Sequence, residues 1–263
     1  MSNFPEIKEV LLRAIKEAGA LVAKGFEADF KVDFKGDINN LVTDVDQASE
    51  RLILSIVQAH FPDHGIIGEE YGNQQENARY KWVIDPIDGT VNFAHRIPLC
   101  CISIAVMQDD ELILGAVYSP MMNELFFAEK GQGAYLNDRR IQVSENGQLE
   151  KAFLVTGFPY VFPEDFNPVA IFEHFLRLGL PIRRLGSAAL DLCWVAAGRF
   201  DAFWENNLQP YDIAAGILIV EEAGGITTNY NNEKITIQGK QVLASNHKMH
   251  TILLEEIQQA LNK

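Results

Sequence analysis

The stretch WVIDPIDGTVNF, residues 82–93, is the one around which the chain is organised. Its apolar start predicts a buried strand, residues 82–84, that runs directly into two carboxylates, Asp85 and Asp88. Pro86 fixes its own φ and favours an extended Asp85, and Gly89 permits a close backbone approach. Burying two unpaired carboxylates is costly. The stretch therefore predicts either a divalent cation with oxygen ligands or an Asp-rich turn that caps the following segment.

The overall charge bears on which partners the chain can bind. The chain has 263 residues and a formal net charge of −14. This acidity disfavours nucleic acid and anionic membranes as partners, because both attract basic surfaces. An anionic substrate is still compatible with this charge if bound metal ions supply positive charge locally.

The cysteines and the N-terminus indicate a cytoplasmic protein. Cys100, Cys101 and Cys193 show no disulfide framework and no C-x-x-C spacing, so we expect reduced, buried thiols. The first residues lack the pattern of a signal peptide, and no apolar run is long enough to span a bilayer.

Hydrophobic periodicity predicts a different architecture for each half of the chain. Apolar residues at helical spacing predict amphipathic helices over about 7–22 and 45–57, the second with Thr43 as N-cap and Asp46 in its first turn. Apolar runs at 99–107 and 112–118 predict antiparallel strands. The second half mixes helices with short strands, including expected strands at 235–237 and 242–244.

Four acids share one position, where an apolar element stops. Glu69 and Asp85 follow strands, Asp88 lies on the next turn, and Asp212 opens a helix. Each has a structural explanation alone, but together they predict a metal site. An all-oxygen ligand set favours Mg²⁺ over Zn²⁺, and backbone N–H groups at Gly89 and Thr90 suit phosphate. Neither G-x-S-x-G nor a Walker A motif is present, which argues against a serine nucleophile or a P-loop.

These motifs together resemble the inositol monophosphatase family along nearly the whole chain. DPIDGTVNF (85–93) is similar to the family pattern D-P-[IL]-D-G-T-x-N-F, and GEE (68–70) and LVTDVD (41–46) to two further segments. GSAALD (186–191), and YDIAAG (211–216) followed by EAGG (222–225), resemble the segments of the second half.

The resemblance implies a binding site for two or three Mg²⁺ ions. The first ion would be held by Glu69, Asp85 and the carbonyl of Ile87, and the second by Asp85, Asp88 and Asp212. A third, weaker ion would lie near Glu69. The implied reaction is hydrolysis of a phosphate monoester by direct attack of metal-activated water, without a phosphoenzyme.

The resemblance also assigns roles around the metals. Thr90 and Glu69 would orient the water, Asp46 would support Thr90, and Lys35 would lie near the water. The remaining contacts are phosphate binding by the amides of Gly89 and Thr90, and binding of the substrate hydroxyls by Gly186, Ser187, Ala188 and Glu205. Tyr211 stands where relatives often have Trp. This residue is expected near the alcohol side of the site, so the resemblance leaves the identity of the substrate undetermined.

The implied fold is α+β (mixed α/β), an α-β-α-β-α layered sandwich. An N-terminal lobe, 1–145, would have an antiparallel sheet and most metal ligands. A C-terminal lobe, 146–263, would have a mixed sheet and supply Asp212 and substrate contacts, so that both form one catalytic unit. The resemblance further implies a homodimer, lithium sensitivity, and a small phosphorylated polyol, myo-inositol 1-phosphate, as substrate. Fructose 1,6-bisphosphate, 3′-phosphoadenosine 5′-phosphate and a non-catalytic interaction role stay as alternatives.

Overall fold

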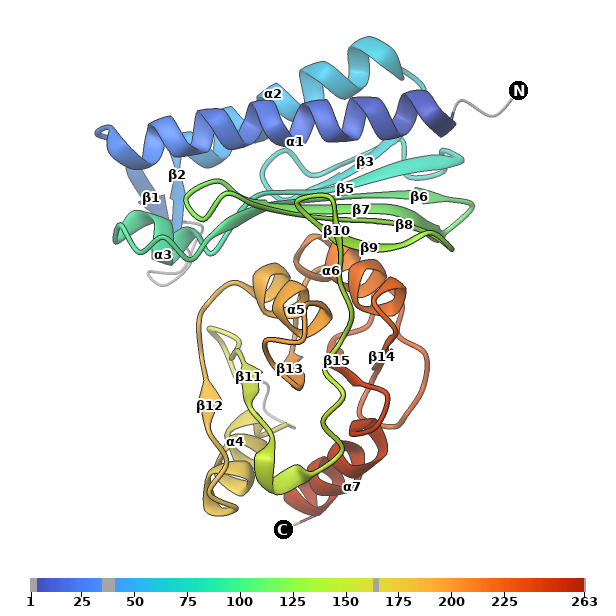
Figure 1. Cartoon of the computed structure of the whole chain (residues 1–263). Helices are drawn as coiled ribbons and strands as arrows, with labels where there is room; N and C mark the ends of the chain where they lie inside the picture. Colours follow the sequence, from blue (N-terminus) through green and yellow to red (C-terminus); the bar gives the residue numbers. More distant parts are fainter. Residues whose placement is uncertain (1–3, 35–40, 163–165, 263) are drawn as a thin grey trace.

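The structure, a computed structural model, describes residues 4–34, 41–162 and 166–262. Helices and strands in this part of the chain alternate in five layers, helix, sheet, helix, sheet, helix (Figure 1). The layered α+β architecture predicted from the sequence is confirmed.

The first layer consists of two long amphipathic helices, α1 (Phe4–Glu27) and α2 (Asp44–His60). The apolar residues that predicted α1 form its buried face, and they pack with the apolar face of α2 against the first sheet. Thr43 is the N-cap of α2, as predicted, and Asp46 completes the capping box. A two-stranded sheet of β1 (Val32–Phe34) and β2 (Leu41–Thr43) lies beside this layer.

The second layer is an eight-stranded sheet, counted over the described residues, in the order β10-β9-β8-β7-β6-β5-β3-β4. Its neighbours pair antiparallel as predicted, except that β3 and β5 run parallel. β5 also continues past the predicted end at Ile84 to Asp88, with a register shift between Asp85 and Asp88. The strands are β3 (Gly65–Gly68), β4 (Asn73–Gln74), β5 (Tyr80–Asp88), β6 (Cys101–Gln108), β7 (Glu111–Ser119), β8 (Glu124–Glu129), β9 (Gly133–Leu136) and β10 (Arg139–Arg140).

The third layer, α5 (Ala188–Ala196) and α6 (Pro210–Glu222), lies between the two sheets (Figure 1). Both helices are apolar around most of their circumference, which is typical of a helix that is buried on all sides. Their residues form one core with the lower face of the first sheet and the upper face of the second. The start of α6 is thereby held directly against the end of β5, where the acids lie.

The second sheet is mixed, as predicted, with the order β12-β11-β13-β15-β14. Its outer face packs against the fifth layer, the helices α4 (Pro168–Arg177) and α7 (His250–Leu261). The expected strand at 235–237 is wrong: these residues form no strand, and only Lys234 makes an isolated bridge. The strands are β11 (Leu154–Thr156), β12 (Ile182–Arg183), β13 (Ala202–Asn206), β14 (Gly225–Thr228) and β15 (Gln241–Asn246).

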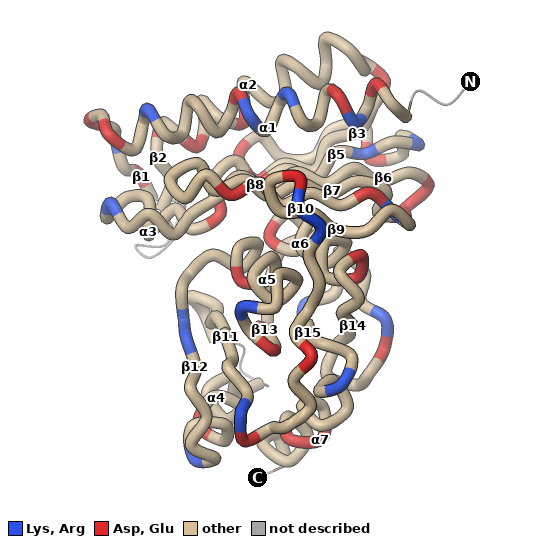
Figure 2. The backbone as a smooth tube through the Cα atoms, in the orientation of Figure 1, with Lys and Arg blue, Asp and Glu red and all other residues tan. Residues whose placement is uncertain are grey.

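The described residues agree with the prediction from cysteine content. All three cysteines are free and buried. Lys and Arg are interspersed with Asp and Glu along the described chain, without a long basic run (Figure 2). None of the described helices combines the length and the apolar character needed to cross a membrane.

The first sheet and α6 touch backbone to backbone at Gly115, and this contact generates a stability prediction. A Cβ at Gly115 would lie 3.0 Å from the carbonyl oxygen of Ala215 and 3.2 Å from its Cα. Because backbone cannot move aside as a flexible side chain can, Gly115→Ala should lower the free energy of unfolding by about 1–3 kcal/mol. Urea denaturation would measure it.

Gly147→Ala is the matched control, because the atoms nearest to its Cβ would be in Lys248 at 3.5 Å, an ordinary contact distance. Equal stability of the two variants would contradict the proposed close packing of α6 on the sheet.

Candidate active site

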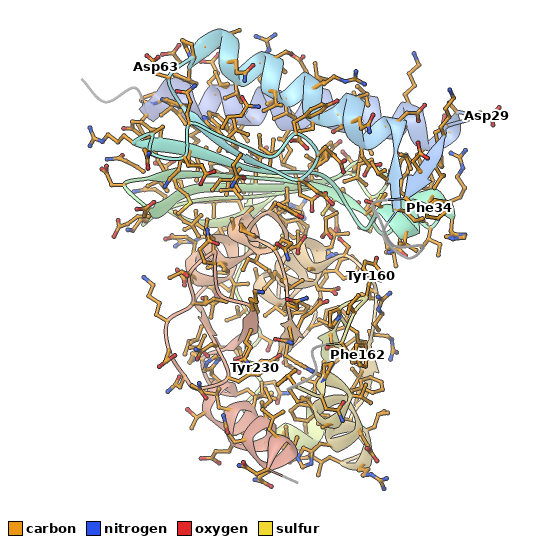
Figure 3. The ribbon with its side chains drawn as sticks, turned by 180° about the vertical axis from the view of Figure 1, so that it is seen from behind. Asp29, Phe34, Asp63, Tyr160, Phe162 and Tyr230 are labelled. Atoms are coloured by element: carbon orange, nitrogen blue, oxygen red, sulfur yellow. The ribbon has the colours of Figure 1, made fainter. Side chains whose placement is uncertain are left out.

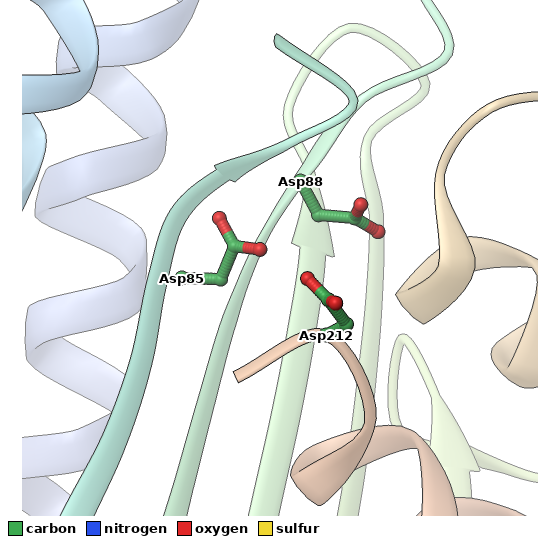
Figure 4. Close-up of side chains that lie close together, drawn as sticks. All are labelled: Asp85, Asp88 and Asp212. Carbon is green, nitrogen blue, oxygen red and sulfur yellow. The ribbon is translucent and has the colours of Figure 1, made fainter. Parts of the chain in front are cut away.

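Three aspartates converge between the first sheet and the third layer. Asp85 and Asp88 come from the irregular end of β5, and Asp212 from the first turn of α6, and the three side chains lie close together (Figure 4). One carboxylate oxygen from each lies within 4.8 Å of the other two. Asp212, which is 124 positions after Asp88 in sequence, thus joins the two aspartates of β5 in a group that could hold a metal ion.

Electrostatic repulsion within this group is strong because the group is buried. Asp85 is 2% exposed and Asp88 9%. Burial raises the pKa of Asp85 well above its usual value, and the charges of Glu69, Asp88 and Asp212 raise it further. Burial raises the pKa of Asp88 to about 6, although hydrogen bonds from Ser187 and Ala189 oppose the shift. The pKa of Asp212 is also raised, first by burial and then by Asp88.

Each aspartate is held by a protein donor at one of its oxygens. The backbone N–H of Ile87 donates to Asp85 Oδ1 at 3.0 Å, and that of Gln209 to Asp212 Oδ2 at 2.6 Å. Asp88 Oδ2 accepts from the Ser187 hydroxyl and the Ala189 N–H, both at 2.7 Å. Buried, oriented, all-oxygen ligands in excess of nearby cations fit a hard divalent ion such as Mg²⁺.

Glu69 lies just beyond the end of β3 and lines the same cavity as the three aspartates. A hydrogen bond with Glu69 contributes to the raised pKa of Asp85, so the two carboxyls are direct neighbours. Glu69 is not part of the group of three aspartates whose oxygens lie within 4.8 Å of one another. The structure therefore places it at one side of that group.

Asp46 makes the capping contacts of α2 and also lies within hydrogen-bond distance of Thr90. Its Oδ2 accepts from the Thr43 N–H at 2.8 Å and from the Thr43 hydroxyl, while its Oδ1 lies 3.0 Å from Thr90 Oγ1. Burial raises the pKa of Asp46 to about 6, and the bonds from Thr43 oppose this. Thr90 Oγ1 is also 2.9 Å from the carbonyl oxygen of Ile87. That carbonyl is thus beside Thr90 as well as within the predicted ligand set.

Gly89 allows three backbone segments to meet next to the aspartates. Its φ is +91°, and a Cβ there would lie 2.9 Å from the carbonyl oxygen of Leu99 and 3.2 Å from that of Gly186. Asn92 ties the same segments together, because its side-chain amide donates to the carbonyls of Leu99 and Leu185, each at 2.8 Å. The N–H groups of the Gly89-Thr90 turn are fixed by these contacts.

The aspartates open into a polar cavity of about 150 Å³, which Gly89, Thr90, Gly186, Ser187, Ala188 and Glu205 also line. Tyr160 lies at its rim, at the junction of the N-terminal and C-terminal layers and close to Phe34 (Figure 3). Glu205, on β13, is 9% exposed, and burial raises its pKa to about 8 while Arg184 opposes the shift.

Two observations depart from the predicted site. Ser187, expected to contact substrate, lines the cavity, but its hydroxyl donates to Asp88, a contact that the sequence did not predict. Arg184 was missed, although it is the one Lys or Arg among the described residues that line the cavity. Its position two residues before the Gly186-Ser187 segment could have identified it as a residue near the substrate. Lys35, predicted to be catalytic, lies outside the described residues.

Comparison with known proteins relates this site to a family. The model of the inositol monophosphatase family matches residues 5–262. The chain is 41% identical over 255 residues to an inositol-1-monophosphatase of a Synechocystis species, covering 96% of this chain and 88% of that protein. It is 38% identical over 260 residues to a protein of Pasteurella multocida named Nus factor SuhB, covering 96% of each. A solved inositol monophosphatase from an Anabaena species superposes with a TM-score of 0.87 at 36% identity, covering 98% of this chain and 97% of that one.

The raised pKa of Asp88 generates a prediction about stability without metal. In the unfolded chain its pKa returns to about 3.9, so the folded protein binds more protons than the unfolded one between pH 4 and 6. Stability in EDTA should therefore fall as pH rises through this range. The isosteric change Asp88→Asn should raise the free energy of unfolding at pH 7 by roughly 1–3 kcal/mol and flatten the pH dependence.

Asp63→Asn is the control, because Asp63 lies on the exposed turn at the far end of the first layer from Phe34 (Figure 3). Chemical denaturation in EDTA at several pH values would measure all three proteins. An Asp88→Asn variant less stable than wild type at pH 7 would contradict the repulsion argument.

Proposed function

The chain belongs to the inositol monophosphatase family of phosphoric monoester hydrolases, and we propose that it hydrolyses a small sugar-alcohol phosphate with Mg²⁺ as cofactor. We further propose myo-inositol 1-phosphate as the substrate. The single observation that supports this best is the convergence of Asp85, Asp88 and Asp212 at a polar cavity. A hydrolytic site lined by converging carboxylates needs cationic charge there to admit an anionic ester and to activate water.

We assign the metal ligands as Glu69, Asp85, Asp88, Asp212 and the carbonyl of Ile87, for two to three ions. The oxygens of these residues suit Mg²⁺, which prefers carboxylates and water. When bound, such ions supply positive charge for the phosphate and lower the pKa of a coordinated water.

Thr90 and Glu69 would position the attacking water. If the Thr90 hydroxyl donates its single proton to Asp46 Oδ1, its oxygen keeps lone pairs that accept a hydrogen bond from water. The Glu69 carboxylate, on the side of Asp85, would accept the second proton of the same water. Asp46 thus acts through Thr90 by fixing which way the hydroxyl points.

Groups on the opposite side of the cavity would bind the ester. The amides of Gly89 and Thr90, fixed by the surrounding loops, would donate to the phosphate oxygens. Glu205 and the backbone of Gly186 and Ala188 would contact hydroxyls of the leaving alcohol, since all three line the cavity. Lys35 is assigned near the water by family resemblance alone.

Two alternative functions stay open to test. Fructose 1,6-bisphosphate or 3′-phosphoadenosine 5′-phosphate could be the ester hydrolysed at the same site. An interaction role is favoured by one specific observation, the Nus factor name of the Pasteurella multocida relative. The buried acids argue for catalysis, since an interaction scaffold has no need of their repulsion.

Further properties follow from family membership and stay predictions. They are a homodimer, inhibition by lithium, a cytoplasmic location, and the division into lobes 1–145 and 146–263 that act as one catalytic unit. Analytical ultracentrifugation and a lithium titration of the activity would test the first two.

The central prediction concerns Asp88 and catalysis. The wild-type protein should release phosphate from myo-inositol 1-phosphate in the presence of Mg²⁺ but not in excess EDTA. Asp88→Asn, predicted above to be the more stable protein without metal, should lose about 10³-fold or more in kcat because charge stabilisation is lost. A colorimetric phosphate assay would measure both.

Asp63→Asn serves again as the control and should keep full turnover. Undiminished turnover in Asp88→Asn would refute the mechanism, and wild-type protein without Mg²⁺-dependent turnover on any of the three esters would favour the interaction role.

A second prediction tests the hydroxyl contact of Glu205. Glu205→Gln should lower kcat/KM for myo-inositol 1-phosphate by about 10-fold or more, because a buried partner for a substrate hydroxyl is lost. The rate on p-nitrophenyl phosphate, which has no such hydroxyl, should stay the same. Equal losses on the two esters would show that Glu205 does not contact the alcohol.

A further inference from the structure

Glu50 is a buried carboxylate beside the site that the mechanism above does not use. It lies on α2, and its side chain is 0% exposed. Its Oε2 accepts from the backbone N–H of Glu70 at 2.7 Å, and its Oε1 from that of Tyr71 at 3.2 Å. Both donors directly follow Glu69, so one carboxylate holds the turn that carries this residue.

The preceding residue, Gly68, approaches the same carboxylate from the other side. A Cβ at Gly68 would lie 2.1 Å from Glu50 Oε1, a distance that no side chain could adopt without displacement. Gly68, Glu70 and Tyr71 therefore all contact the Glu50 carboxylate. Glu69 lies between them in sequence. This contact explains why a glycine with no left-handed φ is placed at the end of β3.

The same face of α2 holds two other parts of the site. Asp46, one turn before Glu50, lies 3.0 Å from the Thr90 hydroxyl, and Ser49 donates to the carbonyl of Pro86 at 3.2 Å. Residues at i, i+3 and i+4 share one helix face, and all three side chains are 0% exposed. α2 thus contacts the water-positioning residue, the turn between the two aspartates, and the Glu69 turn.

We infer that Glu50 is a positioning residue that places the Glu69 carboxylate beside Asp85 for metal and water. The inference rests on the proposed function, because it assumes that Glu69 acts there. A carboxylate accepting two N–H groups forms charge-assisted bonds. Glutamine has one acceptor oxygen and would direct its NH₂ group at one of the two amides, so the turn would lose its fixed geometry.

A purely structural role for Glu50 would lower stability without changing the metal site. Glu222 provides a matched control for this distinction. Its two oxygens accept the backbone N–H groups of Gly131 and Gly133, each at 2.7 Å, and thereby hold the turn between β8 and β9. Neither that turn nor Glu222 lines the cavity of the active site. Glu222→Gln thus makes the same chemical change at a turn outside the site.

The experiment compares wild type, Glu50→Gln and Glu222→Gln by titration calorimetry with Mg²⁺ and by amide hydrogen exchange. Glu50→Gln should bind Mg²⁺ about 10-fold or more weakly, the usual effect of losing a group that orients a metal ligand. The amides of Glu70 and Tyr71 should exchange faster in this variant. Glu222→Gln should keep the wild-type Mg²⁺ affinity and exchange at these two amides.

Gly68→Ala is the second variant, and it keeps the test intact if Glu50→Gln fails to fold. It displaces the Glu50 carboxylate without altering its chemistry, so it should weaken Mg²⁺ binding as Glu50→Gln does. A folded Glu50→Gln or Gly68→Ala protein with wild-type Mg²⁺ affinity would overturn the inference while the proposed function stands. Wild-type protein that neither binds Mg²⁺ nor hydrolyses any ester would overturn both.

Discussion

Three aspartate carboxylates, each with one oxygen within 4.8 Å of the other two and two of them buried, are the constraint on which the rest of the structure depends. Such a group repels itself, and its charge has poor solvation. It persists because the surrounding fold over-determines it. The bulged end of β5 fixes two members, and α6, buried between two sheets, fixes the third. Stability given up here is the usual cost of a site arranged for charge stabilisation.

Different layers of the fold hold different parts of the site. Buried polar side chains of α2 bind the segments beside the group, from the first layer, although the same helix also packs into an apolar core. The start of α5 contacts it from the third layer, where Ser187 and the Ala189 N–H bind Asp88. Hydrogen bonds from both sides replace the water that burial removes, which explains why so many polar groups lie inside the core.

Local patterns predicted what local physics determines. The spacing of Ile7 to Val22 identified the buried face of α1, and the capping of α2 by Thr43 followed from residue types alone. The acids at element ends predicted that Asp85 and Asp88 lie together, since they are only three positions apart in sequence. Contacts that depend on tertiary packing were not predictable in this way: the parallel pairing of β3 with β5, the Ser187–Asp88 bond, and the presence of Arg184 at the cavity. The strand expected at 235–237 shows the converse, a β-branched run that tertiary packing left unpaired.

The cavity is lined by two sets of residues, the acids and the residues around the second sheet, and this division has an evolutionary consequence. The aspartates depend on β5, α6 and the start of α5, whereas Arg184, Glu205 and Tyr160 come from segments around the second sheet. If the second set faces the leaving alcohol, as proposed, substitutions there would change that surface and leave in place the bonds from Ser187 and Ala189 to Asp88. Duplicated genes of this architecture could therefore diverge in the alcohol they release while inheriting one hydrolytic centre. Drift in substrate preference should accumulate in the loops of the second sheet, with the acidic half under stronger purifying selection.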